Sequence, residues 1–554
     1  MSAPTTTDAG TVWAGIRRLL PAASDYRDLR RTWRGDLLAG LTVGIVALPL
    51  ALAFGVSSGA GAESGLVTAI VAGVVAAVFG GSNVQVSGPT GAMVVVLGPI
   101  VAQHGAGVLA VVCILAGLIV LAAGALRLGR AVTFIPWPVI EGFTLGIAVI
   151  IFLQQVPAAL GSKPGPSSNA FVAAVESLAG VTWPQVAATL GIVAVVAAIM
   201  VLTPRIHPQF PGSIVAIAVV SVACWLLPLP VATIGELPAG LPAPALPSAD
   251  WSTITGLAGP AIAVAALAAI ESLLSARVAA SISDTGPYDA DRELVGQGLA
   301  SIASGLFGGM PATGAIARTA VNVRSGGRTR LAAVVHALAL LLIVSIGATV
   351  VGAIPLAALS GVLMVTACRM ISVATVRSVV GSTRTDAVVF VVTALVTVSV
   401  DLIYAVLIGI AFAAFFALRA LARSAGVHRE ELPGPALPGD ERIALFRLDG
   451  ALFFGAAERV LERVAEIRDA EVVILRMSQL QVLDATGAQV VGELITGLER
   501  RGVTVLVKGI QTRHMQLAER VGVIAALRHE NHLFDDLPAA VEHARSHVRR
   551  AGAA

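Results

Sequence analysis

Two short motifs place proline, threonine and glycine inside otherwise apolar sequence. The first is SGPTGAM at 87–93, and the second is GMPATGAIAR at 309–318. Proline has no N–H to lose in the first turn of a helix, a threonine hydroxyl can cap a helix or bind a ligand, and glycine lets a ligand approach the backbone. Each motif predicts a helix that begins inside the membrane with unpaired N–H groups and a positive dipole end. Two such ends facing each other would bind an anion.

Two charged residues extend this candidate site. Arg318, in the second motif, adds a fixed positive charge, which is costly in a membrane and therefore indicates a function as counter-charge for an anion. Glu271, in AIESLLSARV, could carry a proton, help to hold Na⁺, or pair with Arg318 in a purely structural ion pair. Ser275 is one helical turn further along the same face and could assist Glu271.

Three other polar residues of the apolar region have weaker claims. Glu141 is expected to lie near the end of its span and reach water. His336 is expected to be a hydrogen-bonded helix residue, and Asp401 a loop residue, rather than ligands.

Composition defines the class of protein. The 554 residues are 56% hydrophobic and only 13% charged, and their mean hydropathy is +0.86, so we expect a polytopic membrane protein. A net charge of +3 is too small to indicate nucleic-acid binding. Cys113, Cys224 and Cys368 have neither a CxxC spacing nor a nearby histidine, so no disulfide framework and no metal site is expected. No cofactor motif, Walker lysine or catalytic triad is apparent, so we predict a protein that is not an enzyme.

Hydropathy predicts about fourteen spans, because about 20 apolar residues cross the hydrocarbon. They lie near 36–57, 64–81, 89–103, 106–126, 133–159, 184–203, 211–228, 254–281, 294–309, 313–324, 331–353, 355–373, 384–400 and 402–423. Arginines follow the even-numbered spans, whereas the loops after odd-numbered spans contain only Lys163. The 35 N-terminal residues are polar and lack a signal-peptide pattern. Both termini are therefore expected in the cytoplasm, with the chain in the cytoplasmic (inner) membrane.

The third and tenth spans are too short to cross alone, and both begin with the repeated motif. They are seven spans apart, so the chain is expected to contain an inverted repeat of seven plus seven spans with a half-helix in each. This arrangement is typical of transporters whose substrate site lies at the repeat interface. The segments before the motifs, NVQVSG at 83–88 and GLFGGM at 305–310, are expected to be briefly extended. The alternative is that proline and glycine merely kink two helices.

The composition changes near residue 425. We expect a cytoplasmic N-terminal segment at 1–35, a transport domain at 36–425, a linker at 426–440 and a small α/β domain of alternating strands and helices at 441–550. Asp484 and Thr486, in the turn DATG, are expected to cap the following helix.

Several ordered motifs resemble the sulfate permease (SulP) family, whose animal members are solute carrier family 26. They are VSGPTGAM, GGMPATGAIARTAVNVRSGG, RGDLLAGLTVGIVALPLALAFGVSSG, ESLLSA and RELVGQGLASI. The resemblance implies that spans 1–4 and 8–11 form a core that moves against a gate in elevator-like alternating access. It also implies a homodimer. The C-terminal domain resembles a STAS domain; in soluble relatives a serine of the corresponding turn is phosphorylated, and Thr486 occupies that position, so it is the alternative regulatory site.

The resemblance places the anion between the starts of the two half-helices. The candidate binding residues are Thr90, Gly91, Ala92, Thr313, Gly314, Ala315, Ile316, Ala317 and Arg318. Glu271 matches the family's acidic position. Bicarbonate importers of the family that use Na⁺ typically have aspartate there and no arginine at position 318, so proton symport or anion exchange is favoured over Na⁺ coupling. The opening and eighth-span motifs look most like bacterial members that carry dicarboxylates.

The resulting prediction is a secondary active anion transporter that couples protons to a dicarboxylate or inorganic anion. Alternatives are a sulfate or bicarbonate transporter or exchanger without proton coupling, a platform that senses anions and signals through the STAS domain, an anion channel, and a nucleobase permease, which usually has no STAS tail. The expected partners are a small anion, membrane lipid, a second copy of the chain and a cytoplasmic protein that binds the STAS domain.

Overall fold

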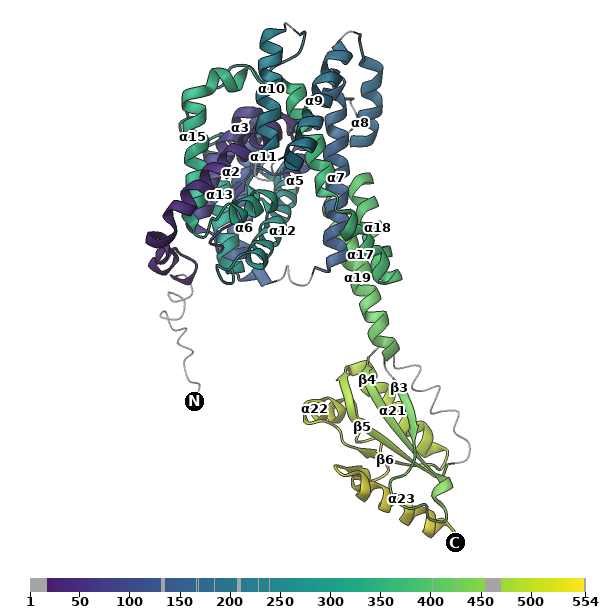
Figure 1. Cartoon of the computed structure of the whole chain (residues 1–554). Coiled ribbons are helices and arrows are strands. Elements are labelled where there is room, and N and C mark those ends of the chain that lie inside the picture. Colours follow the sequence, from purple (N-terminus) through teal and green to yellow (C-terminus); the bar gives the residue numbers. More distant parts are fainter. Residues whose placement is uncertain are drawn as a thin grey trace. The chain divides into compact units, whose positions relative to one another are not determined.

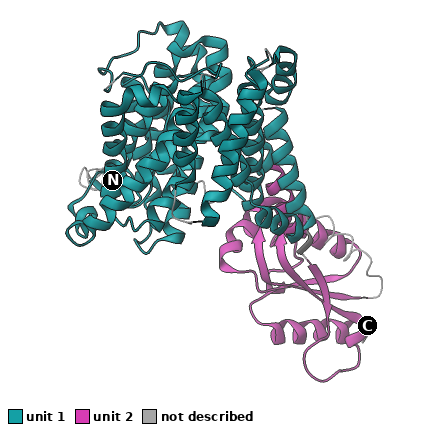
Figure 2. Cartoon of the chain, turned by 45° about the horizontal axis from the view of Figure 1, so that its top comes forward, with its two compact units in different colours: residues 1–410 teal, residues 411–554 magenta. Residues whose placement is uncertain are grey.

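The computed structural model describes residues 17–130 and 135–552, apart from residues 166, 168, 184, 207–210, 228, 239, 401, 425 and 454–469. The chain divides into two compact units, Met1–Ile410 and Ala411–Ala554 (Figure 2). The first unit is almost entirely helical, and the second contains a five-stranded sheet.

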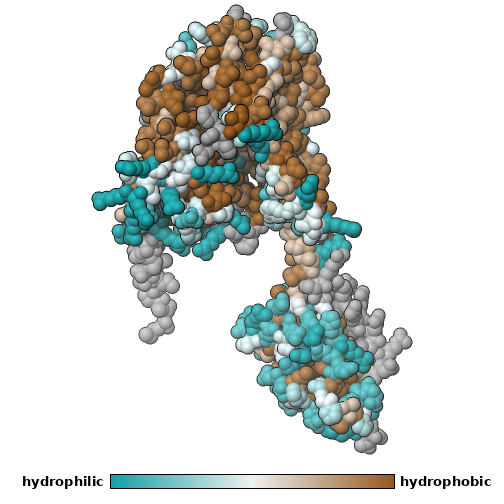
Figure 3. Space-filling model, in the orientation of Figure 1, coloured by the Kyte–Doolittle hydropathy of each residue, from teal (hydrophilic) through white to brown (hydrophobic). Residues whose placement is uncertain are grey.

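Nine helical segments of the described residues are long and apolar enough to cross a membrane. They are Leu29–Ser57 (α2), Ala62–Phe79 (α3 to α4), Ala106–Ala125 (η3 and α6), Trp137–Ala159 (α7), Gln185–Ile206 (α9), Ala258–Ile282 (α12), Arg330–Gly352 (α15), Leu356–Ser382 (α16 and α17) and Tyr404–Ala422 within α19 (Leu402–Ser424). Helices satisfy their own backbone hydrogen bonds, which lipid cannot do. Hydrophobic residues accordingly cover most of the visible side of this unit (Figure 3).

The other helices of the first unit are shorter. They are α5 (Gly91–His104), α8 (Ala170–Glu176), α10 (Gly212–Leu226), α11 (Trp251–Gly256), α13 (Ala290–Leu306), α14 (Ile316–Arg324) and α18 (Arg384–Ser399). Five of them, α5, α10, α13, α14 and α18, cover most of the predicted spans at 89–103, 211–228, 294–309, 313–324 and 384–400. The number of spans and the inverted repeat stay predictions.

Small residues let α13 pack tightly against α6 (Leu109–Ala125). A Cβ atom at Gly298 would lie 2.6 Å from the backbone nitrogen of Leu121, so only glycine fits this helix crossing. The same helix carries the polar side chains of Glu293 and Gln297 into the interior. The close packing therefore fixes α13 as a rigid support for its neighbours.

Two very short strands pair where the half-helices begin. β1 (Ser87–Gly88) runs antiparallel to β2 (Thr313–Gly314), with Ser87 opposite Gly314 and Gly88 opposite Thr313. α5 begins at Gly91, and α14 begins at Ile316. Ala315 N also donates to Val86 O at 2.9 Å. The pairing gives partners to backbone groups that have left the helices deep in the protein.

One part of this arrangement differs from the sequence prediction. The segment 305–310 was expected to be extended, but α13 continues to Leu306. The extended stretch is instead Thr313–Gly314, which was assigned to the tenth span. The physical reason is the pairing with β1, which holds these residues out of helical conformation and delays the start of α14 to Ile316.

The sheet of the second unit has the order β3-β4-β5-β6-β7. Its strands are β3 (Gly426–Glu430), β4 (Ile443–Leu452), β5 (Val472–Leu483), β6 (Thr504–Lys508) and β7 (Leu533–Phe534). β3 is antiparallel to β4, and the other neighbours are parallel. β3 lies inside the predicted linker 426–440, so the sheet starts earlier than expected. The helix predicted after β4 falls at 454–469, outside the described residues.

Helices cover both faces of this sheet (Figure 1). α21 (Ala485–Arg500) buries Val491 and Ile495 against one face, where α22 (Thr512–Val521) also packs. α23 (Leu537–Gly552) buries Val541 and Ala544 against the other. Apolar residues alternate along β4 and β5, so each strand contributes to both cores.

Candidate functional site

A carboxylate on α12 connects the two motifs. The hydroxyl of Thr90 donates to Glu271 Oε2 at 2.6 Å, and the hydroxyl of Thr313 lies 2.8 Å from the same oxygen. The two hydroxyl oxygens are 3.0 Å apart. Figure 1 shows α5 and α12 side by side. Glu271 therefore lies directly beside the residues that precede both half-helices.

The threonines do not cap the half-helices through their side chains. Thr90 occupies the N-cap position of α5 with an extended backbone, but its hydroxyl makes no capping hydrogen bond. The N-cap of α14 is Ala315, which has no hydroxyl. The N–H groups of a first helical turn have no partner within the helix. Both half-helices therefore begin with donors that no side chain at the N-cap satisfies, as an anion site requires.

Arg318, the last residue of the second motif, reaches the first motif with its guanidinium and is only 2% exposed. Its Nη2 donates to the backbone oxygen of Pro89 at 2.7 Å. Its Nη1 is buried and has no hydrogen-bond partner among the described residues. A Cβ atom at Gly88, whose φ is +152°, would lie 2.7 Å from that nitrogen. Glycine at position 88 therefore makes room for the guanidinium.

The alternative prediction that Arg318 and Glu271 form a purely structural ion pair is wrong. No ion pair within 4.0 Å joins them in the part of the chain that the structure describes. Arg318 bonds to a carbonyl, and Glu271 bonds to hydroxyl groups. The cation and the carboxylate therefore have separate hydrogen-bond partners, while their charges still act on each other.

The first turns of the half-helices differ in accessibility. Gly91 is buried, and a Cβ atom there would lie 2.4 Å from Ile151 Cδ1 of α7. Ala92 is also buried. In α14, by contrast, Ile316 is 44% exposed and Ala317 is exposed too. Ligand access is therefore better at the start of α14 than at the start of α5.

Ser275 does not assist Glu271. Its hydroxyl lies 3.4 Å from the hydroxyl of Thr319, which accepts from Val86 N at 3.0 Å. The neighbouring Ser272 contacts the site instead, because its Oγ accepts from Gly314 N at 3.1 Å. The sequence identified the correct helix, α12. The packing of α12 against β2 determines that Ser272, and not Ser275, bonds to the second motif.

Two buried residues that sequence reasoning missed support the first motif. Glu293 accepts from Gly81 N at 2.8 Å and from Ser82 N at 3.2 Å. Gln297 Nε2 lies 2.9 Å from Glu293 Oε1 and 2.6 Å from Ser87 Oγ. These contacts hold the segment that leads into β1. Their spacing of four residues within the motif RELVGQGLASI, at the start of an apolar span, was the signal that could have identified them.

The weaker candidates have mixed outcomes. His336 was expected to be hydrogen-bonded, but it is fully buried and neither ring nitrogen has a partner among the described residues. Glu141 accepts from Trp137 Nε1 at 3.0 Å and is partly buried. Asp401 lies outside the described residues.

In the second unit, the capping interpretation of Asp484 is confirmed. Asp484 is the N-cap of α21, and its Oδ1 accepts from Gly487 N at 2.7 Å. Thr486 is exposed in the first turn of α21. Its modification stays a prediction.

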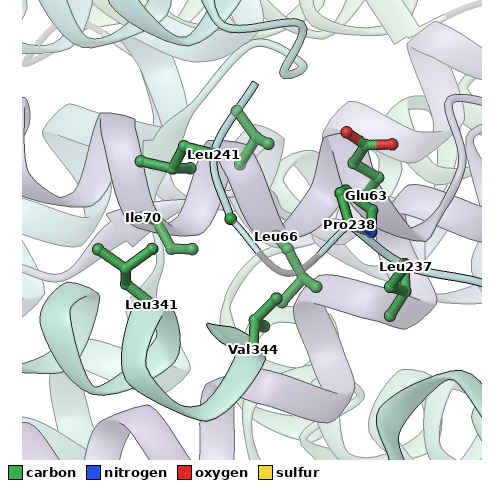
Figure 4. A pocket seen from close by; sticks show the side chains of 10 residues that line it. Glu63, Leu66, Ile70, Leu237, Pro238, Leu241, Leu341 and Val344 are labelled. Carbon is green, nitrogen blue, oxygen red and sulfur yellow. The ribbon is translucent and has the colours of Figure 1, made fainter. Parts of the chain in front are cut away.

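A pocket elsewhere in the first unit is unsuited to an anion. Figure 4 shows Leu66, Ile70, Leu341 and Val344 gathered beside Leu237, Pro238 and Leu241, with Glu63 as the charged residue of the lining. Its volume of about 10 Å³ would hold no more than about one water molecule. The half-helix starts therefore remain the better candidate site.

A helical membrane unit in which short helices begin beside a buried cation and a partly buried carboxylate is typical of membrane transporters. The chain belongs to the sulfate permease family, whose pattern matches residues 33–393, and residues 434–540 match the STAS domain. It is a transmembrane anion transporter of this family and not an enzyme.

Two curated relatives match over most of their length. A putative sulfate transporter, YvdB of Bacillus subtilis, is 33% identical over 90% of this chain and 96% of its own. The bicarbonate transporter BicA of Synechocystis is 31% identical over 93% of this chain and 94% of its own.

Two solved structures resemble the fold. SLC26A9 matches with a TM-score of 0.83 at 17% identity and covers 98% of this chain and 95% of its own. The transmembrane domain of a cyanobacterial BicA matches with a TM-score of 0.61 at 32% identity and covers 69% of this chain and 98% of its own. The mostly helical membrane domain followed by a STAS domain with a mixed sheet is therefore the family's fold.

Proposed function

We propose that the chain is a secondary active transporter that couples a proton to a dicarboxylate or inorganic anion. The observation that carries this proposal is the position of Glu271, whose carboxylate accepts hydrogen bonds from Thr90 and Thr313 at the starts of the two half-helices. An anion held at those helix ends would lie close to this carboxylate.

Electrostatic repulsion explains how proton binding and anion binding would be coupled. The anion binds to first-turn N–H groups of α5 and α14 and to the unpartnered Nη1 of Arg318. An ionised Glu271 repels that anion, and the repulsion is strong where little water screens it. A proton on Glu271 removes the repulsion. Proton and anion therefore each increase the affinity for the other, because coupling between two sites is reciprocal.

The proposed architecture has fourteen spans in a seven-plus-seven inverted repeat, with both termini in the cytoplasm and the chain in the inner membrane. Segment 1–35 precedes the transport domain 36–425, and the linker 426–440 contributes β3 to the sheet that the 441–550 domain completes. Two copies form a homodimer in lipid, and the core moves against the gate as an elevator. A cytoplasmic partner binds the STAS domain. Thr90, Gly91, Ala92 and the 313–318 segment form the anion site.

The test is uptake of labelled succinate, fumarate, sulfate and bicarbonate into proteoliposomes, with and without an inward proton gradient. Wild-type uptake of the transported anion should rise with the gradient, whereas uptake by Glu271→Gln should be indifferent to it, because the amide cannot gain or lose the proton. Glu63→Gln, at an exposed carboxylate of the same unit, is the control and should behave like the wild type. Equal proton-driven uptake by Glu271→Gln would refute the coupling.

The second candidate is transport of sulfate or bicarbonate without proton coupling, by uniport or exchange. The similarity to a putative sulfate transporter and to a bicarbonate transporter favours it. Sulfate or bicarbonate flux that ignores both pH and Glu271→Gln would support it. Anion binding without flux of any of the four anions would instead support an anion sensor that acts through the STAS domain.

A further inference from the structure

Three histidines gather in the second unit, far along the chain from the residues of the transport site. His532 ends the 3-10 helix η7 (Glu530–His532), and His543 and His547 lie on α23. One ring nitrogen of each histidine lies within 4.8 Å of those of the other two. His543 Nε2 and His547 Nε2 are 3.2 Å apart. The three imidazole rings therefore converge on one point.

The fold holds these rings in place. His543 and His547 are four residues apart and so project from the same face of α23. That helix packs on the sheet through Val541 and Ala544. His532 is 5% exposed and directly precedes β7, and the ring of Phe534 lies 5.3 Å from that of His543. The cluster is thus anchored on both sides by the core of the unit.

The cluster lacks ordinary partners. Nδ1 of His532 is buried without a hydrogen-bond partner among the described residues. None of the ion pairs found in the described chain involves the three histidines. A neutral imidazole carries a free lone pair on one of its ring nitrogens, which a metal ion can accept. An unsatisfied buried imidazole is costly, and a metal ion would remove that cost.

We propose that His532, His543 and His547 bind a divalent transition-metal ion, and that this ion is Zn²⁺. Imidazole nitrogen suits Zn²⁺, Cu²⁺ and Ni²⁺. Zn–N bonds of about 2.0–2.1 Å in a tetrahedron separate neighbouring nitrogens by about 3.3 Å. The observed separation of 3.2 Å between His543 and His547 meets this requirement. The nitrogen of His532 lies within 4.8 Å of the other two, so the distances that it makes must shorten by at most about 1.5 Å. Water would take the fourth coordination position of the metal ion.

Nearby positive charge opposes the ion without preventing its binding. Arg528 and Arg550 both act electrostatically on the cluster. Arg528 is largely exposed and is paired with Glu499 at 3.2 Å, so water and this carboxylate weaken its repulsion of the ion. The bound ion joins η7 to α23 and so fixes the last helix on the sheet.

The expectation that the chain has no metal site was based on its cysteines alone. His543 and His547 have the H-x₃-H spacing common among zinc ligands, and the third ligand comes from outside their helix. Only the fold shows that His532 joins them.

The experiment uses the full-length protein in detergent, purified with a tag that contains no histidine and stripped of metal. Zn²⁺ is titrated against a chromogenic chelator, and Co²⁺ is titrated while its visible absorption is recorded. The wild type should bind one ion per chain more tightly than the His543→Ala/His547→Ala double variant, with the intense Co²⁺ absorption of a four-coordinate site. His428→Ala, at an exposed histidine of the same unit, should match the wild type.

A second readout separates metal binding from folding. Zn²⁺ should raise the melting temperature of the wild type and of His428→Ala but not that of the single variant His547→Gln, whose own metal-free melting temperature should stay near the wild-type value. Equal zinc affinity of the wild type and the double variant would overturn the proposal. Absence of tight binding to the wild type would also overturn it and leave a hydrogen bond between His543 and His547.

Discussion

Arg318 donates a hydrogen bond of 2.7 Å from Nη2 to the backbone oxygen of Pro89, which directly precedes the N-cap of α5. The two residues come from different motifs, so one side chain of the second motif fixes the start of the first half-helix. The other terminal nitrogen of Arg318 has no hydrogen-bond partner among the described residues.

The first prediction concerns Arg318 itself. Arg318→Ala should raise the KM for the transported anion by about 10- to 100-fold, because a hydrogen bond to a charged group contributes about 1.5–3 kcal/mol. Uptake into proteoliposomes measures this change, and size-exclusion chromatography confirms that the variant is folded. Arg277→Ala removes an exposed arginine from α12 and should leave KM unchanged. An unaltered KM in Arg318→Ala would exclude the guanidinium from the anion site.

The second prediction rests on the proposed proton coupling. Thr313→Val keeps the shape of the side chain but removes a hydroxyl that lies 2.8 Å from Glu271 Oε2. The ionised carboxylate is then less stabilised, so the pH midpoint of proton-driven uptake should rise by about one unit, as expected for about 1.4 kcal/mol. Thr313→Ser should restore the wild-type midpoint.

Thr366→Val is the matched control, because that hydroxyl bonds only within its own helix, to Val362 O. Its pH midpoint should equal that of the wild type. A midpoint that Thr313→Val does not move would argue against a role of Thr313 in setting the charge of Glu271.

The third prediction concerns the space beside the guanidinium. Gly88→Ala should destabilise the protein by about 1–3 kcal/mol, because alanine is strained at a φ of +152°. The new methyl group should also displace Arg318 from Pro89 O and raise the anion KM. Thermal melting and uptake measure the two effects. Gly98→Ala, where the nearest atom is 3.8 Å away, should be tolerated. Equal behaviour of the two variants would contradict the proposed fit.

The fourth prediction is a pH dependence at the N-terminal edge of the first unit. Asp25 Oδ2 accepts from Arg292 Nη2 at 2.7 Å and from Ala22 N at 3.0 Å. Burial by itself raises the pKa of Asp25, but the hydrogen bonds from Arg292 and Ala22 N and the charges of Arg292 and Arg330 together lower it below its ordinary value of 3.8. A lowered pKa means that the pair stabilises the fold above about pH 4 and loses this effect as the pH falls through the folded-state pKa.

Asp25→Asn should therefore cost on the order of 1 kcal/mol at neutral pH, and its melting temperature should approach that of the wild type as the pH falls below about 4. Melting curves of the detergent-solubilised protein between pH 3 and pH 7 measure the difference. Asp28→Asn changes an exposed aspartate nearby and should show no such convergence. If the melting temperature of the wild type still exceeded that of Asp25→Asn by the same amount at pH 3, the stabilising role of the ionised Asp25 would be contradicted.

The sequence by itself determined the membrane class, the places of the two half-helices and three strands of the second unit, β4, β5 and β6. Each depends on residues close together in the chain: the long apolar runs of the spans, the proline and glycine of 89–91, and the short apolar run VVIL at 472–475. Asp484 was recognised as a cap for the same reason. Local properties of this kind can be read directly from a few neighbouring residues.

Only the tertiary structure decided which distant groups meet. The pairing of β1 with β2 moved the start of α14 to Ile316, and α12 brought Glu271 to Thr90 and Thr313. The packing places Ser272, instead of Ser275, in hydrogen-bond contact with Gly314 N, and it brings His532 to the two histidines of α23. These contacts depend on the rotation and depth of each helix in its packing. A rotation of one residue, about 100°, turns a side chain to another face, and no local pattern specifies that choice.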